Sequence, residues 1–183
     1  MKIEREDILT PANVATIVGL GLTLHGAANL DSLQGVAEIG LGRALDLVDG
    51  PLARRFHASR FGAALDGTAD KIGTIAMVAG AYHYDAAPDV VLAGVLAQNI
   101  VNAGLTLYTE HKGRDPESSF AGKRGMFFQN LAIGAFALAS VVESQPFQNG
   151  LEVAGGIVAA IGFILGAIGT KGYFQDAFGH KKN

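Results

Sequence analysis

Long uncharged stretches most restrict what this chain can fold into. Four of them carry no formally charged residue: residues 11–30, 90–107, 125–142 and 153–170. A bilayer-spanning helix needs about 20 mainly apolar residues, within a range of about 17–25. Two further apolar segments, residues 32–53 and 63–82, are interrupted by charged side chains. The sequence therefore predicts an all-α fold, an integral membrane bundle of six transmembrane helices.

The basic residues of the connections fall on one side of this predicted bundle. They precede the first span, lie between the second and third and between the fourth and fifth, and follow the sixth: Lys2, Arg5, Arg54, Arg55, Arg60, Lys112, Arg114, Lys123, Arg124, Lys171, Lys181 and Lys182. Arg43 and Lys71 lie inside predicted spans, toward the same side. The positive-inside rule makes that side cytoplasmic and places both termini there. A soluble helical protein with unusually buried helices, the alternative, would not require this alternation.

The start of the chain, "MKIEREDILTPANV", is charged and amphipathic. Its acidic residues Glu4, Glu6 and Asp7 do not fit a cleavable signal peptide. We interpret it as a short N-terminal amphipathic surface helix that leads into the first span.

The length of 183 residues indicates a single domain over residues 1–183. Without cysteine no disulfide can form, and the net charge of −3 argues against a general nucleic-acid-binding protein.

Four aspartates lie in the two interrupted segments. Asp46 and Asp49 are three residues apart on one helix face, and Asp66 and Asp70 are four apart on another. A short connection makes the two helices antiparallel neighbours, so both pairs can face each other at the cytoplasmic end. A charge at the bilayer centre costs about 2.5–3.5 kcal/mol on insertion scales, and four converging carboxylates repel. Divalent cations with a preference for oxygen, Mg²⁺ or Mn²⁺, are the natural compensation.

The residues after Asp49 suit a phosphate-containing ligand. Gly50 and Ala53 are small enough to let a bulky ligand approach the helix backbone. Arg54 can pair with a phosphate. The alternative for Arg54, as for Arg55 and Arg60, is a charge at the lipid headgroups that only sets the topology.

Together these positions resemble the signature of the CDP-alcohol phosphotransferases, which reads here Asp46-x-x-Asp49-Gly50-x-x-Ala53-Arg54, seven residues, then Gly62-x-x-x-Asp66-x-x-x-Asp70. The family's N-terminal Pro-Asn-x-x-Thr is echoed in "TPANVAT", where Ala12 is inserted before Asn13 and the spacing from Asn13 to Thr16 is kept.

The resemblance implies a six-helical, commonly dimeric membrane enzyme. Such an enzyme moves a substituted phosphate from a CDP-linked lipid, here CDP-diacylglycerol, to an alcohol and releases CMP. The resemblance implies two Mg²⁺ or Mn²⁺ ions held by Asp46, Asp49, Asp66 and Asp70, with Asp70 also acting as general base. It assigns the binding of the CDP group to Gly50, Ala53, Arg54, Gly62, Asn13 and Thr16.

The acceptor is suggested by "SSFAGKRGMFFQ", residues 118–129. This stretch resembles the Ser-x-x-Gly-Lys-x-x-Thr region of phosphatidylglycerophosphate synthases at Gly122 and Lys123. Glycerol 3-phosphate is then the expected acceptor, with Lys123, Arg124 and Arg114 as candidates for binding its phosphate. Inositol phosphate, serine or another alcohol stays open as acceptor. The alternative for these basic side chains is contact with anionic lipid.

Other classes of protein also use acids within a membrane. A transporter would spread them through the membrane depth, and a prenyl-transfer enzyme would carry adjacent Asp pairs.

Asn99 and Asn102 share a helix face and either bond to another helix or line a polar cavity. Gly162 and Gly166 have GxxxG spacing, which suits packing within one chain or a dimer seam.

Overall fold

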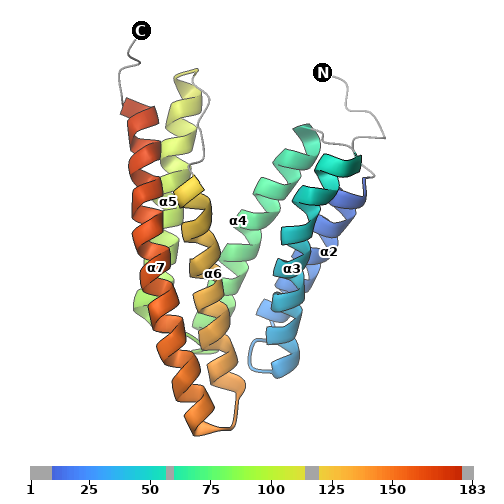
Figure 1. Ribbon diagram of the computed structural model, residues 1–183, viewed down its shortest axis with the longest axis vertical. Helices are drawn as coiled ribbons and strands as arrows, with labels where there is room; N and C mark the ends of the chain where they lie inside the picture. Colours follow the sequence, from blue (N-terminus) through green and yellow to red (C-terminus); the bar gives the residue numbers. More distant parts are fainter. Residues whose placement is uncertain (1–9, 57–59, 114–119, 179–183) are drawn as a thin grey trace. The chain divides into compact units, whose positions relative to one another are not determined.

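The computed structural model describes residues 10–56, 60–113 and 120–178, and the side chains of residues 49–60 lie outside this description. Within these ranges the chain forms α-helices and no strand, as the all-α prediction requires (Figure 1). The helices are α2 Pro11–Ala27, α3 Leu33–Phe56, α4 Arg60–His83, α5 Asp89–His111, α6 Phe120–Val141 and α7 Gln145–Phe178. The predicted N-terminal surface helix lies outside the described residues.

The chain divides into two compact units. The first comprises Met1–Ala86 with Ser140–Val142, and the second comprises Ala87–Ala139 with Glu143–Asn183. The first unit therefore contains α2, α3 and α4, and the second contains α5, α7 and most of α6. The single domain over residues 1–183 stays a prediction.

Local sequence determines where α2 begins. The Thr10 hydroxyl accepts a hydrogen bond from the backbone N–H of Asn13, with 3.1 Å between the two atoms. This is the N-cap interaction for which Thr is a preferred residue. Pro11 follows in the first turn, where its missing N–H costs no helical hydrogen bond. The "TP" of "TPANVAT" therefore works as a helix start.

Glycines allow α2 and α3 to pack closely. A Cβ on Gly42 of α3 would lie 2.5 Å from the carbonyl oxygen of Gly19 on α2, so a side chain does not fit there. Within this unit successive helices run in opposite directions, so the end of α3 and the start of α4 lie at the same end as the start of α2 (Figure 1). Helix α2 packs along both α3 and α4, whereas α3 and α4 meet over a shorter stretch.

In the second unit, α7 buries small residues and exposes large apolar ones. Its buried positions are Gly155, Ala159, Gly162, Gly166, Gly169 and Ala177. Its exposed apolar positions include Val153, Ile157, Ile161, Ile164 and Ile168. A Cβ on Gly125 of α6 would lie 2.5 Å from the backbone nitrogen of Gly166, so these glycines serve packing within the chain. Small residues at helix contacts and apolar ones outward are typical of membrane helices.

Two of the described helices are long and apolar enough to cross a membrane. They are α5 and α7, with mean hydropathy 1.7 and 2.2 in their most apolar windows. The predicted six-span bundle is therefore not confirmed. Helices α3 and α4 carry the charged residues of the aspartate motif, and α2 has only 17 residues.

Candidate functional site

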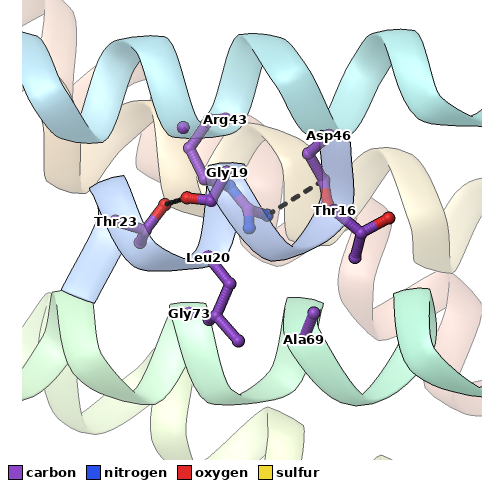
Figure 2. A pocket seen from close by; sticks show the side chains of 9 residues that line it. Thr16, Gly19, Leu20, Thr23, Arg43, Asp46, Ala69 and Gly73 are labelled. Carbon is purple, nitrogen blue, oxygen red and sulfur yellow. Dashed lines mark hydrogen bonds and ion pairs between the residues drawn. The ribbon is translucent and has the colours of Figure 1, made fainter. Parts of the chain in front are cut away.

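A small pocket lies among the three helices of the first unit. It is lined by side chains and backbone from α2, α3 and α4 (Figure 2): Thr16, Gly19, Leu20, Thr23, Gly42, Arg43, Asp46, Ala69 and Gly73. Its free volume is about 10 Å³, which is near the lower limit for one water molecule. The close approach of α2 to α3 at Gly19 and Gly42 forms one wall.

Arg43, which lines this pocket, joins two of the predicted metal ligands. Its Nη2 atom lies 2.5 Å from Oδ1 of Asp70 on α4 and 3.7 Å from Oδ2 of Asp46 on its own helix. Figure 2 shows the ion pair between Arg43 and Asp46. The three side chains are only 20–24% exposed, so water screens their charges incompletely. The first and last aspartates of the motif thus converge on one positive charge.

The two residues that match the family's Asn and Thr in "TPANVAT" are both buried on α2. Thr16 lines the pocket together with Asp46, and its hydroxyl donates a hydrogen bond to the Ala12 carbonyl oxygen over 3.0 Å. Asn13 lies one turn earlier on α2 and is also buried. The extra Ala12 therefore leaves Thr16 at the pocket.

The other residues of the motif are placed less completely. Asp66 is exposed on α4, one turn before Asp70, and Gly62 is half-buried a further turn before it. Asp49, Gly50, Ala53 and Arg54 belong to α3, but their side chains lie outside the described residues. Among the side chains that the structure describes, no three His, Asp or Glu residues gather closely enough to hold a metal ion. The four-aspartate metal site therefore stays a prediction.

Carboxylates are nevertheless the right chemistry for the implied ions. Mg²⁺ and Mn²⁺ prefer oxygen ligands, and Asp46 and Asp70 each present an oxygen to the same cationic nitrogen atom. The structure therefore already places a positive charge beside two of the predicted ligands. These two aspartates fit a divalent cation.

The predicted acceptor residues lie in the second unit. Lys123 and Arg124 are both exposed in the first turns of α6. The guanidinium carbon of Arg124 lies 4.0 Å from the ring centroid of Phe120, which is a cation–π geometry. Arg114 lies outside the described residues.

Arg43 was not predicted from the sequence to belong to the site. From the sequence it was interpreted only as a basic residue toward the cytoplasmic side. A signal was present, because Arg43 precedes Asp46 by three residues and so shares its helix face. The contact with Asp70 had no such signal, since it depends on how two helices pack.

Polar side chains connect the helices of the second unit. The Thr170 hydroxyl on α7 donates to Oδ1 of Asn102 on α5 over 2.8 Å. Gln98 donates to the Thr170 hydroxyl over 3.4 Å and accepts a hydrogen bond from Gln129 of α6. Asn99 instead donates to the Val95 carbonyl oxygen of its own helix. For Asn102, bonding to another helix is therefore the correct alternative.

Comparison with known proteins gives a family. The sequence profile of the CDP-alcohol phosphatidyltransferase family matches residues 7–168. Searches among curated proteins and among solved structures found no match. The matched region covers most of the chain, includes residues of both units and contains every position of the aspartate motif. The chain therefore belongs to the CDP-alcohol phosphatidyltransferase family.

Proposed function

We propose that this chain transfers a phosphatidyl group from CDP-diacylglycerol to glycerol 3-phosphate and releases CMP. Family membership supplies the reaction class, which is transfer of a phosphatidyl group from a CDP-alcohol to an acceptor. The choice of glycerol 3-phosphate is supported by the resemblance around Gly122 and Lys123 to phosphatidylglycerophosphate synthases. On the same basis Lys123, Arg124 and Arg114 bind the acceptor's phosphate.

One observation carries the proposal for the catalytic site: Asp46 and Asp70, from two helices, converge on a single cationic nitrogen. We place Mg²⁺ or Mn²⁺, two ions in all, with Asp46, Asp49, Asp66 and Asp70. When bound, such ions neutralise the charge that develops on a diphosphate as it is cleaved. The CDP group is bound by Gly50, Ala53, Arg54, Gly62, Asn13 and Thr16, of which Thr16 lines the pocket.

Asp70 performs the proton transfer. Its carboxylate accepts the proton of the acceptor's hydroxyl group, and the hydroxyl oxygen then forms a bond to the phosphorus atom that carries diacylglycerol. The bond from that phosphorus to the bridging oxygen of the diphosphate breaks, and CMP leaves with the bonding electrons. Positioned bases of this kind contribute a factor of about 10²–10⁴ to the rate.

The proposed location follows from the substrate. The lipid tails of the donor stay in the bilayer while its polar headgroup reaches a site at the membrane surface. We propose an integral protein of the cytoplasmic membrane, with the site and both termini facing the cytoplasm, as the basic connections indicate. The apolar helices α5 and α7 support membrane insertion. From the family resemblance we also propose a homodimer. We expect it to contact membrane lipids and to bind no nucleic acid.

A release assay tests this function and its acceptor together. Purified protein in lipid nanodiscs is given CDP-diacylglycerol, Mg²⁺ and one of three acceptors: glycerol 3-phosphate, serine or inositol phosphate. We expect CMP to appear with glycerol 3-phosphate. CMP release only with serine or only with inositol phosphate would support the proposed reaction and show that the acceptor is a different alcohol. The absence of CMP with a wide panel of alcohols would refute the proposed enzyme.

A further inference from the structure

Arg43 places a positive charge beside both Asp46 and Asp70. Its Nη2 atom lies 2.5 Å from Oδ1 of Asp70 and 3.7 Å from Oδ2 of Asp46. The contact with Asp70 crosses from α3 to α4, so it also holds the two helices in register at this point. An arginine cannot relinquish its charge by losing a proton at ordinary pH. Only movement of the side chain can therefore remove this charge from the pocket.

The pocket beside Arg43 is too small to hold a hydrated divalent ion together with the guanidinium. The pocket has a free volume of about 10 Å³, and Mg²⁺ usually retains several water molecules. A Cβ on Gly73 would lie 3.4 Å from Nη1 of Arg43, an ordinary van der Waals distance, so the guanidinium lies beside this part of α4. A divalent ion that binds Oδ1 of Asp70 therefore competes with the guanidinium for that oxygen.

We propose that Arg43 is an exchangeable counter-ion of the metal site. It holds Asp46 and Asp70 together before a divalent ion binds, and it releases Asp70 when the ion arrives. This inference rests on the proposed function, which puts metal at these two aspartates. Arg43 is a positioning residue that lowers metal affinity, because each binding event breaks the pair between Arg43 and Asp70. It also prevents the repulsion of two part-buried carboxylates in the metal-free protein.

Binding of Mn²⁺ without substrate tests this exchange. Free Mn²⁺ is measured by electron paramagnetic resonance during titration of the full-length protein in nanodiscs. We expect Arg43→Gln to bind Mn²⁺ about tenfold more tightly than the wild type, because a competing part-buried charge pair is gone. Arg43→Lys keeps the charge and should stay near the wild type. Lys171→Gln, which removes an exposed charge on α7, is the control for net charge.

The possible outcomes separate this inference from the proposed function. Equal or weaker Mn²⁺ binding by Arg43→Gln, beside normal binding by the wild type, overturns the role of Arg43 and leaves the metal site standing. Equal tightening by Arg43→Gln and Lys171→Gln overturns it too, since net charge would then explain the change. No Mn²⁺ binding by any variant overturns both the exchange and the proposed metal site.

A measurement on the wild type covers the case in which Arg43→Gln does not fold. Phenylglyoxal modifies guanidinium groups, and peptide mass spectrometry reports the modified fraction at each arginine. We expect added Mn²⁺ to raise the modification rate of Arg43 several-fold, because the side chain leaves Asp70. Arg5, which belongs neither to the aspartate motif nor to the proposed acceptor residues, serves as the internal reference. An unchanged or reduced rate at Arg43 overturns the proposal.

Discussion

The carboxylate of Asp70 pairs with Arg43 in the structure. In the proposed reaction the same carboxylate accepts a proton. Asp70→Asn keeps the size of the side chain and removes the base. We expect CMP release to fall by a factor of at least about 10², while binding of the CDP-linked donor, measured with labelled donor, is retained.

Asp85→Asn is the matched control for Asp70→Asn. Asp85 lies in the turn after α4 at a φ of +53°, a conformation that Asn also tolerates, and it lies outside the motif. Its activity should equal that of the wild type. Full CMP release by Asp70→Asn in the presence of Mg²⁺ would remove Asp70 from the base role.

At this scale the sequence predicted which helix faces can meet better than which side chains pair. The spacing of the motif placed Asp46 and Asp70 on helix faces that can meet, and the structure brings both to Arg43. It did not predict the guanidinium between them, because a basic residue near a helix end can turn toward lipid headgroups or inward. Asp66, one turn before Asp70 on α4, is exposed, and its place in the metal site stays a prediction.

At the scale of elements, the contact between α2 and α3 depends on Gly42. Gly42→Ala inserts a methyl group 2.5 Å from the Gly19 carbonyl oxygen, so a helix must shift. Overpacking of this kind costs about 1–3 kcal/mol. We expect a lower unfolding temperature in detergent, with a lower rate of CMP release because Asp46 lies four residues further along α3.

Gly40→Ala is the control for that substitution on the same helix. A Cβ on Gly40 has no neighbour within 4 Å, and Ala in a helix interior is favoured over Gly by about 0.5–1 kcal/mol. Gly40→Ala should therefore unfold at an equal or higher temperature than the wild type. Equal destabilisation by both variants would show that the two helices do not pack as described.

The hydrogen bonds of Thr170 give a second prediction for the helices. Thr170→Val keeps the shape of the side chain and removes the hydroxyl that connects α7 to Asn102 and Gln98. Hydrogen bonds between membrane helices contribute about 0.6 kcal/mol on average and up to about 1.7 kcal/mol. We expect a loss in this range by thermal or denaturant unfolding, and recovery in Thr170→Ser. A Thr170→Val protein as stable as the wild type would contradict a stabilising role for this network.

Helix positions were largely predictable, whereas helix ends were not. The uncharged run over residues 153–170 predicted a span that the structure extends to Gln145–Phe178. A charged residue such as Glu152 or Lys171 ends an apolar run without ending a helix, because its side chain can stay exposed. The number of membrane spans was hard to predict for the same reason. The charged residues within α3 and α4 are compatible with a helix, but they make a membrane crossing less favourable.

At the scale of the whole molecule, the family match covers residues of both compact units. Residues 7–168 match as one stretch and include the aspartate motif of the first unit and Lys123 of the second. A motif with fixed spacing is readable from sequence alone, so the family was predictable. The acceptor stays a prediction, because the stretch around Gly122 and Lys123 has no comparably fixed pattern.

Metal dependence of CMP release is the most direct test of the central claim that aspartates from α3 and α4 form a metal-dependent phosphotransferase site. The wild-type protein is incubated with CDP-diacylglycerol and glycerol 3-phosphate, first in excess EDTA and then after Mg²⁺ or Mn²⁺ is restored. We expect no CMP in EDTA and full recovery with either ion. Undiminished CMP release in EDTA would contradict the account.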